Sequence, residues 1–256
     1  YTQWLHDRLG AQVHGMWVPE RVWEQGYVRD LVDAGMQYTV LDDYHFKAAG
    51  LTEDRLTGCY VTEDDGRVMA VYPGSERLRY TIPFADPQET IDYLREMGRR
   101  DPQAVVVFGD DGEKFGTWPG TKKHVYEDRW LERFFETLEE NRDWLEVCTL
   151  GAAFEAVEPR GKIYLPDCSY REMTEWALPV SRQQEYEGLN RQMEHDPRWP
   201  AIRGMLRGGF WRNFRVKYPE ADEMYARMLG VSRRYRAAQA FHGDDPTLAE
   251  VRDELY

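Results

Sequence analysis

A run of four apolar residues, 105–108, leads directly into a glycine and a pair of aspartates in the stretch VVVFGDDGEKFGTWPG. Valine and phenylalanine favour strands, and a run that is apolar at every position is typical of a strand buried on both faces. Strands of that kind occur mainly in parallel sheets covered by helices. This stretch therefore restricts the chain to an α/β fold, and it places carboxylates where a buried strand ends.

The first 46 residues have the pattern of one strand–helix–strand unit. Residues 13–18 form a short apolar run, and residues 27–35 repeat apolar side chains at helical spacing before a glycine. Residues 38–46 are a second apolar run. Two parallel strands and their crossover helix require about this length of chain. The sequence thus predicts a β-α-β unit in which residues 38–46 are extended.

Two alternating runs flank Asp65-Gly66 within residues 59–73. Asp-Gly between alternating runs is a strong signal for a hairpin turn. Residues 78–84 also have a strand-like pattern. Asp86 and Pro87 are the residue types preferred at the cap and first position of a helix, so a helix is expected to begin there and to lead into the strand at 105–108.

The pattern changes near residue 164. Residues 126–144 form an amphipathic helix pattern, and residues 146–157 contain a further short strand pattern. After about residue 164 strand patterns become scarce and helical patterns dominate, with a break expected at Pro219. We therefore expect a β/α part over residues 1–164 and a mainly helical region over residues 165–256.

Composition and charge exclude several classes of protein. Hydrophobic residues make up 42% of the chain and aromatic residues 14%, which indicates a globular core rather than disorder. The net charge of −13 argues against a nucleic-acid surface and is usual in cytoplasmic proteins, the location we expect. No apolar run approaches the roughly 20 residues of a membrane span. Cys59, Cys148 and Cys168 form no CxxC pair, so neither a zinc ribbon nor a disulfide framework is indicated.

Polar side chains follow three of the predicted strands. In parallel β/α folds the active residues lie at the carboxyl ends of the strands, on the loops that follow them. The candidates are Trp17, Glu20 and Arg21 after the first strand, Asp42, Asp43, Tyr44 and His45 after the second, and Asp110, Asp111, Glu113 and Trp118 after the third. If the strands are neighbours in one sheet or barrel, these groups meet at one rim.

Carboxylates from two strand ends suit acid/base or covalent chemistry at a glycosidic bond, and tryptophans suit the apolar faces of sugar rings. Each feature also has a structural interpretation. Glu20 could be a helix cap or an ion-pair partner, the Asp-Asp-Gly sequence at residues 110–112 a turn, and Trp17 a core residue. It is the combination of the three that favours a site.

A rival interpretation takes Asp42, Asp43 and His45 as metal ligands, as in metal-dependent polysaccharide deacetylases. Residues 43 and 45 would share one face of a strand. The six histidines form no HxxxH or HExxH pattern, which argues against this interpretation, and no metal or organic cofactor is expected.

Two stretches, GMWVPERVWEQG and VVVFGDDGEKFGTWPG, together resemble two motifs of glycoside hydrolase family 57, most closely those of its 4-α-glucanotransferases and α-amylases. SYREMTEWALP and GGFWRNFRVKYPEADEMYARML resemble the later part of these enzymes. The resemblance covers nearly the whole chain. It implies an incomplete seven-stranded β/α barrel followed by a helical region, and a retaining reaction on α-1,4-glucosidic bonds of an α-glucan or maltooligosaccharide.

The resemblance also implies roles for individual residues. Glu20 matches the family's nucleophile, and Asp111 matches its general acid/base through the pattern Asp-x-Glu-x-Phe-Gly. Trp17 and Trp118 match aromatic positions that line the donor site, and Glu113 belongs to the same motif as Asp111. The remaining candidates, Asp43 and His45, are expected either to hold sugar hydroxyls or to have a structural role.

The sequence departs from the family pattern in three places. The early His-Gln-Pro motif, a second motif with an active-site glutamate and the final motif near an AYWHG-like stretch do not occur in these residues. The resemblance therefore implies the central part of a family member. A non-catalytic glucan-binding piece stays open as an alternative to an enzyme, and the oligomeric state is not predicted.

Overall fold

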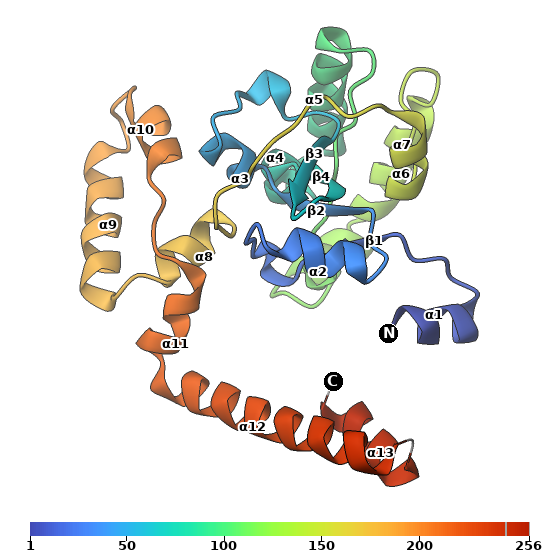
Figure 1. The fold of residues 1–256 in the computed structure, drawn as a ribbon. Coiled ribbons are helices and arrows are strands. Elements are labelled where there is room, and N and C mark those ends of the chain that lie inside the picture. Colours follow the sequence, from blue (N-terminus) through green and yellow to red (C-terminus); the bar gives the residue numbers. More distant parts are fainter. Residues whose placement is uncertain (244, 256) are drawn as a thin grey trace. The chain divides into compact units, whose positions relative to one another are not determined.

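The computed structural model describes residues 1–243 and 245–255, which gather into two compact units. One contains Tyr1–Arg171 together with Asp196–Arg207, and the other contains Glu172–His195 and the chain from Gly208 onward. Figure 1 shows the course of the chain. The division of the chain at residue 164, inferred from the sequence, remains a prediction.

The first unit is built on one four-stranded sheet in the order β1-β2-β4-β3. Its strands are β1 (Gly15–Trp17), β2 (Tyr38–Asp42), β3 (Tyr60–Asp64) and β4 (Arg67–Gly74). β1 and β4 both pair with β2 in parallel, whereas β3 and β4 form an antiparallel hairpin. The predicted β-α-β unit is confirmed, and so is the hairpin, whose turn residues Asp65 and Gly66 have positive φ angles of 50° and 77°.

Helices of the first unit precede, connect and follow these strands. They are α1 (Thr2–Leu9), α2 (Tyr27–Asp33), α3 (Asp43–Ala48), α4 (Glu76–Thr81), α5 (Pro87–Arg100), α6 (Trp130–Glu140), α7 (Leu150–Ala156) and α10 (Trp199–Met205). A π-helical turn covers Lys123–Glu127. The predicted start of α5 is confirmed, because Asp86 caps it by accepting from the backbone N–H of Gln88 and Pro87 occupies its first turn.

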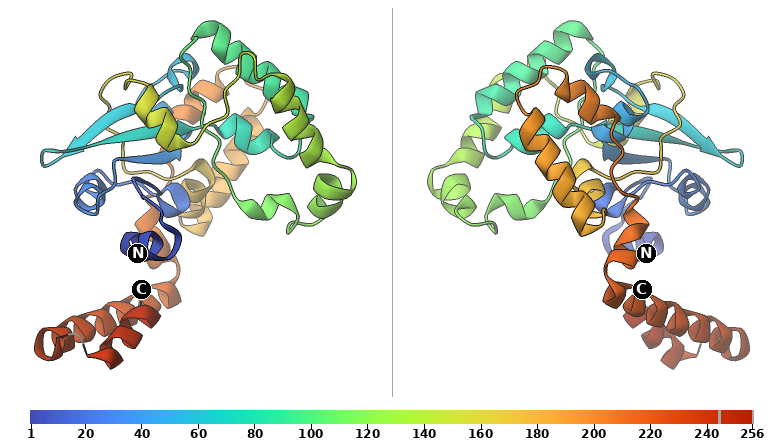
Figure 2. Two further views of the ribbon diagram at one scale, coloured as in Figure 1. Left: turned by 90° about the vertical axis from the view of Figure 1, so that its right-hand side faces the viewer. Right: turned by 90° about the vertical axis from the view of Figure 1, so that its left-hand side faces the viewer.

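The sheet is buried on both faces. Leu41 of β2 and Val71 of β4 pack with Val28 of α2 and Phe46 of α3. On the other face, alternate residues of β2 and β4 pack with Val105, Val107, Leu150 and Phe154, the last two from α7. Figure 2 shows α2 and α7 on opposite sides of the strands. The core thus has a covered sheet whose strands β1, β2 and β4 are parallel, as the apolar run at 105–108 indicated.

The run at 105–108, expected as a strand, forms only a single bridge, from Val107 to Gly74. Three further expected strands contain helices instead. Residues 78–84 are mainly helical, because the Ser75 side chain caps α4 by accepting from the N–H of Leu78. Residues 43–46 lie in α3, which begins where Asp42 accepts from the N–H of Tyr44. Residues 146–157 contain α7, which Thr149 caps. In each case a side-chain cap outweighed strand-like composition.

The second unit is helical, as predicted for the later part of the chain. It contains most of α8 (Arg171–Trp176), then α9 (Val180–Met193), α11 (Phe214–Lys217), α12 (Pro219–His242) and α13 (Pro246–Leu255). The break expected at Pro219 is confirmed, since α11 ends before it and α12 starts with it. No helix among the described residues is long and apolar enough to cross a membrane.

Candidate active site

Four segments end at the same edge of the sheet. The strands β1, β2 and β4 run parallel and end at Trp17, Asp42 and Gly74. Val107 forms a parallel bridge with Gly74, so the loop after the apolar run starts at this edge as well. Asp42 and Asp43 therefore lie at the edge where the loops that carry Glu20 and Asp111 begin.

Glu20 lies in a short 3-10 helix, Pro19–Arg21, with an unusual backbone. Glu20 has φ 54° and Arg21 has φ 49°, both in the left-handed region that non-glycine residues avoid. Such a conformation costs of the order of 1 kcal/mol or more per residue and persists only where neighbouring groups impose it. Here the backbone oxygen of Glu20 accepts from Ser169 Oγ, and its carboxylate Oε2 accepts from Tyr170 Oη at 2.7 Å.

The guanidinium of Arg21 is buried between aromatic rings. It lies 5.2 Å from the ring centroid of Trp17 and 4.6 Å from that of Tyr170. Asp42 Oδ2 lies 3.8 Å from Arg21 Nη1 and 3.7 Å from Arg79 Nη2. The buried Asp42 carboxylate thus faces two guanidinium groups, and the rings of Trp17 and Tyr170 offset part of the excess positive charge through cation–π contact. The ion pair that Arg21 forms is therefore with Asp42.

Neighbouring aspartates in the loop after the apolar run have opposite environments. The side chain of Asp110 is only 2% exposed and forms an ion pair with Lys114, which is 5% exposed. Asp111 and Glu113 are exposed. Asp110 Oδ1 also accepts from the backbone N–H of Asp111 at 2.9 Å. Asp110 therefore anchors the loop, and Asp111 is the carboxylate that a substrate could reach.

Contacts join the Asp110 loop to the Glu20 loop. Lys114 Nζ donates to the backbone oxygen of Arg79, as well as pairing with Asp110. The Arg79 guanidinium lies 5.6 Å from the ring centroid of Tyr170, and Tyr170 donates to Glu20. These side chains form a continuous connection between the segments that carry the two predicted catalytic carboxylates.

The two predicted tryptophans are both partly exposed beside this connection. Trp17 is 39% exposed, and a Cβ added to Gly109 would lie 2.6 Å from its ring, so the ring packs directly against the glycine. Trp118 is 41% exposed and stacks on Phe84 with ring centroids 6.3 Å apart and planes 15° apart. Both rings retain surface that could contact a sugar.

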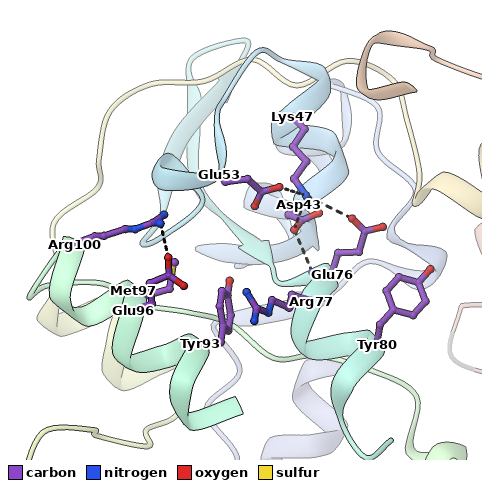
Figure 3. A pocket seen from close by; sticks show the side chains of 10 residues that line it. All are labelled: Asp43, Lys47, Glu53, Glu76, Arg77, Tyr80, Tyr93, Glu96, Met97 and Arg100. Carbon is purple, nitrogen blue, oxygen red and sulfur yellow. Dashed lines mark hydrogen bonds and ion pairs between the residues drawn. The ribbon is translucent and has the colours of Figure 1, made fainter. Parts of the chain in front are cut away.

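Asp43 lies in a different setting, at a cavity of about 480 Å³ between α3, α4 and α5 (Figure 3). Lys47 Nζ lies 3.2 Å from Asp43 Oδ2, 2.8 Å from Glu53 and 3.5 Å from Glu76. One cation therefore faces three carboxylates. Burial raises the pKa of Asp43 to about 7, with Asp42 and Glu76 acting in the same direction and Lys47 opposing them. The residues that line this cavity include neither Glu20 nor Asp111.

His45 is fully buried beneath the Glu20 loop. Its ring nitrogens face two backbone oxygens, Nε2 that of Arg21 at 2.8 Å and Nδ1 that of Asp42 at 3.0 Å. Burial lowers the pKa of His45, although the Asp42 carboxylate and the two carbonyl oxygens oppose this shift. Because α3 is helical, residues 43 and 45 do not share a face as they would on a strand.

The roles predicted for Asp43 and His45 at sugar hydroxyls stay predictions, and their burial favours the structural alternative. Among the residues that the structure describes, no three His, Cys, Asp or Glu side chains gather in a way that could hold a metal ion. The sequence did not single out Ser169, Tyr170 or Arg79. The signal available for the first two was their place in SYREMTEWALP, one of the stretches that resemble the later part of the family's enzymes.

Comparison with known proteins gives two family matches. Residues 1–166 match the model of glycosyl hydrolase family 57, and residues 209–256 match that of the middle domain of alpha-amylase/4-alpha-glucanotransferase. Alpha-amylase 1 of Dictyoglomus thermophilum is 43% identical over 98% of this chain and 36% of its own length. The 4-alpha-glucanotransferase of Thermococcus litoralis is 44% identical over 90% of this chain and 35% of its own length.

Solved structures agree with these matches. The crystal structure of the Thermococcus litoralis 4-alpha-glucanotransferase superimposes with a TM-score of 0.87 at 42% identity, covering 92% of this chain and 37% of that one. The alpha-amylase AmyC of Thermotoga maritima gives 0.51 at 14% identity over 77% of this chain and 50% of that one, a likeness of fold alone. The chain spans about a third of the length of the curated relatives it matches. The expected fold, part of a β/α barrel followed by helices, is confirmed by the first of these structures.

Proposed function

The chain belongs to glycosyl hydrolase family 57, and on that premise we propose that it carries the catalytic carboxylates of a retaining enzyme that cleaves or transfers α-1,4-glucosidic bonds of an α-glucan. Glu20 is the nucleophile and Asp111 the general acid/base. Relatives named alpha-amylase and 4-alpha-glucanotransferase support a substrate of this class. Trp17 and Trp118, with Glu113 nearby in sequence, are proposed to line the sugar site.

One observation carries the proposal: the Glu20 loop and the Asp111 loop start at one edge of the sheet and are joined by Lys114, Arg79 and Tyr170. The difference in exposure between Asp110 and Asp111 supports Asp111 as the acid/base, because a proton donor must reach the glycosidic oxygen.

The proposed reaction has two steps. Glu20 attacks the anomeric carbon while Asp111, initially protonated, donates its proton to the departing oxygen, which gives a covalent glucosyl-enzyme. Asp111 then removes a proton from an incoming water or sugar hydroxyl, whose oxygen displaces Glu20. Water yields hydrolysis and a sugar yields transfer. Retention requires the two carboxyl groups to lie about 5 to 5.5 Å apart across the bond.

Glu20→Gln in the complete protein tests this assignment. We expect the variant to lose turnover of maltotriose by a factor of about 10³ or more, since an amide cannot form the glucosyl ester. Glu89→Gln, an exposed residue of α5, is the control for loss of a surface charge. Near-normal activity of Glu20→Gln would contradict the assignment of Glu20 as the nucleophile. In the unchanged protein, products longer than maltotriose indicate transfer, and glucose and maltose alone indicate hydrolysis.

A further inference from the structure

Tyr170 is the side chain that donates a hydrogen bond to the Glu20 carboxylate. It is 8% exposed, and its hydroxyl donates to Glu20 Oε2 at 2.7 Å. Its ring has cationic neighbours, with the guanidinium of Arg21 4.6 Å and that of Arg79 5.6 Å from its centroid. A buried ring held in this way has little freedom to turn its hydroxyl away from Glu20.

The phenol is a proton donor at neutral pH. Burial raises the pKa of Tyr170, and the hydrogen bond to Glu20 and the negative charge of Glu20 raise it further, while Arg21 and Arg79 act in the opposite direction. A tyrosine whose pKa lies above its usual value keeps its proton, so the bond runs from Tyr170 to a carboxylate oxygen. Bonds to a charged acceptor are stronger than those between neutral groups.

The residues before Tyr170 hold the backbone of the same loop. Cys168 and Trp23 exchange both backbone hydrogen bonds, at 2.8 and 3.1 Å, and Ser169 Oγ donates to the backbone oxygen of Glu20. Three consecutive residues, 168–170, therefore hold the end of the Glu20 loop, the backbone of Glu20 and its carboxylate, in a loop whose left-handed conformation needs external support.

We propose that Tyr170 is a positioning residue that occupies Glu20 Oε2 and leaves Oε1 as the oxygen that attacks the sugar. This inference rests on the proposed function. As the bond from Oε1 to the anomeric carbon forms, the bond from that carbon to the glycosidic oxygen breaks and Asp111 transfers its proton to the departing oxygen. Oε2 becomes the carbonyl oxygen of the ester and continues to accept from Tyr170.

Tyr170→Phe in the complete protein removes the hydroxyl and keeps the ring. We expect kcat to fall about tenfold while KM stays within about twofold, because the bond acts on the nucleophile and not on substrate binding. The acidic limb of the pH profile of kcat/KM should also move about one unit to higher pH, since a hydrogen bond to the charged carboxylate favours the charged form. Tyr164→Phe is the matched control, because the exposed Tyr164 donates to Glu63 at 2.6 Å.

A second variant separates this effect from a loss of folding. 3-Fluorotyrosine at position 170 preserves the shape of the side chain and makes the phenol a stronger donor, so the acidic limb should move to lower pH, opposite to the phenylalanine variant. If the acidic limb of the kcat/KM profile lies at the wild-type pH in both variants, the proposed role of Tyr170 is overturned. If Glu20→Gln is inactive while the Tyr170 variants behave as wild type, only this inference fails; if Glu20→Gln is active, the proposed function itself fails.

Discussion

Lys114→Met should destabilise the protein strongly, because it leaves a buried charge without its partner. The side chains of Lys114 and Asp110 are 5% and 2% exposed, and Lys114 Nζ also donates to the backbone oxygen of Arg79. Removing one partner of a buried ion pair costs about 3–5 kcal/mol of unfolding free energy, mainly through the desolvated charge that remains. Methionine retains most of the side-chain volume, so a cavity adds little to that cost, but it loses the cation–π contacts that Lys114 Nζ makes with Phe84 and Trp118.

The measurement is chemical denaturation of the wild type, Lys114→Met, Asp110→Asn and the double variant. The double variant carries no buried charge at this place, and we expect it to recover most of the stability that Lys114→Met loses. Lys123→Met is the matched control: Lys123 pairs with Asp128 at 2.6 Å on the surface, where little change is expected. A Lys114→Met variant within about 1 kcal/mol of wild type, or a double variant no more stable than Lys114→Met, would contradict the cost expected for an unpaired buried charge.

Two further predictions concern Asp43 and Trp17. The pKa of Asp43 is raised from 3.8 in the unfolded chain to about 7, so the folded protein binds one more proton between these values, and its stability should fall as pH rises from about 4 to about 7. Denaturation of the wild type across this range should show this fall, and in Asp43→Asn the slope of stability against pH should be smaller by the equivalent of up to one proton. An identical slope in both proteins contradicts the assignment. Gly109→Ala should raise KM for maltooligosaccharides by displacing the Trp17 ring, whereas Gly112→Ala, with open space around its Cα, should not; equal KM values for the two variants contradict contact of Trp17 with the sugar.

The sequence predicted best where one local rule decides the conformation. Asp65-Gly66 gave the hairpin because aspartate and glycine tolerate the positive φ angles of the turn. Asp86-Pro87 gave the start of α5, because a capping carboxylate and a residue without an N–H fit that position. Both patterns depend on a few neighbouring residues, so no tertiary information was needed.

Prediction from the sequence failed where a cap competed with strand-like composition. Residues 78–84 alternate apolar and polar side chains, yet Ser75 starts a helix whose buried face includes Leu78. The run at 105–108 packs on both faces only in part: Val105 and Val107 contact one cluster and Val106 another, but Phe108 is exposed. Its strand pairing is limited to one bridge at Val107, which side-chain pattern does not encode.

The residues of the candidate site could likewise be predicted from the sequence only in part. Glu20, Asp111 and the tryptophans belong to contiguous motifs and could be named from the sequence. Tyr170 lies 150 residues from Glu20, and Lys114 meets Arg79 across 35 residues. Those partners depend on which loops the sheet brings to one edge, so a single sequence without coordinates does not identify them.

Glu20 is proposed to form the covalent bond to the sugar, and trapping the glucosyl-enzyme identifies the carboxylate that forms this bond. The complete protein is treated with a fluorinated α-glucosyl fluoride, which reacts quickly to form the glucosyl-enzyme and slowly to release it, and the labelled peptide is sequenced by mass spectrometry. We predict one glucosyl group on Glu20, at higher yield than in Tyr170→Phe. A label on any other carboxylate, or turnover with inversion of configuration and no label, would contradict the role of Glu20 as the nucleophile.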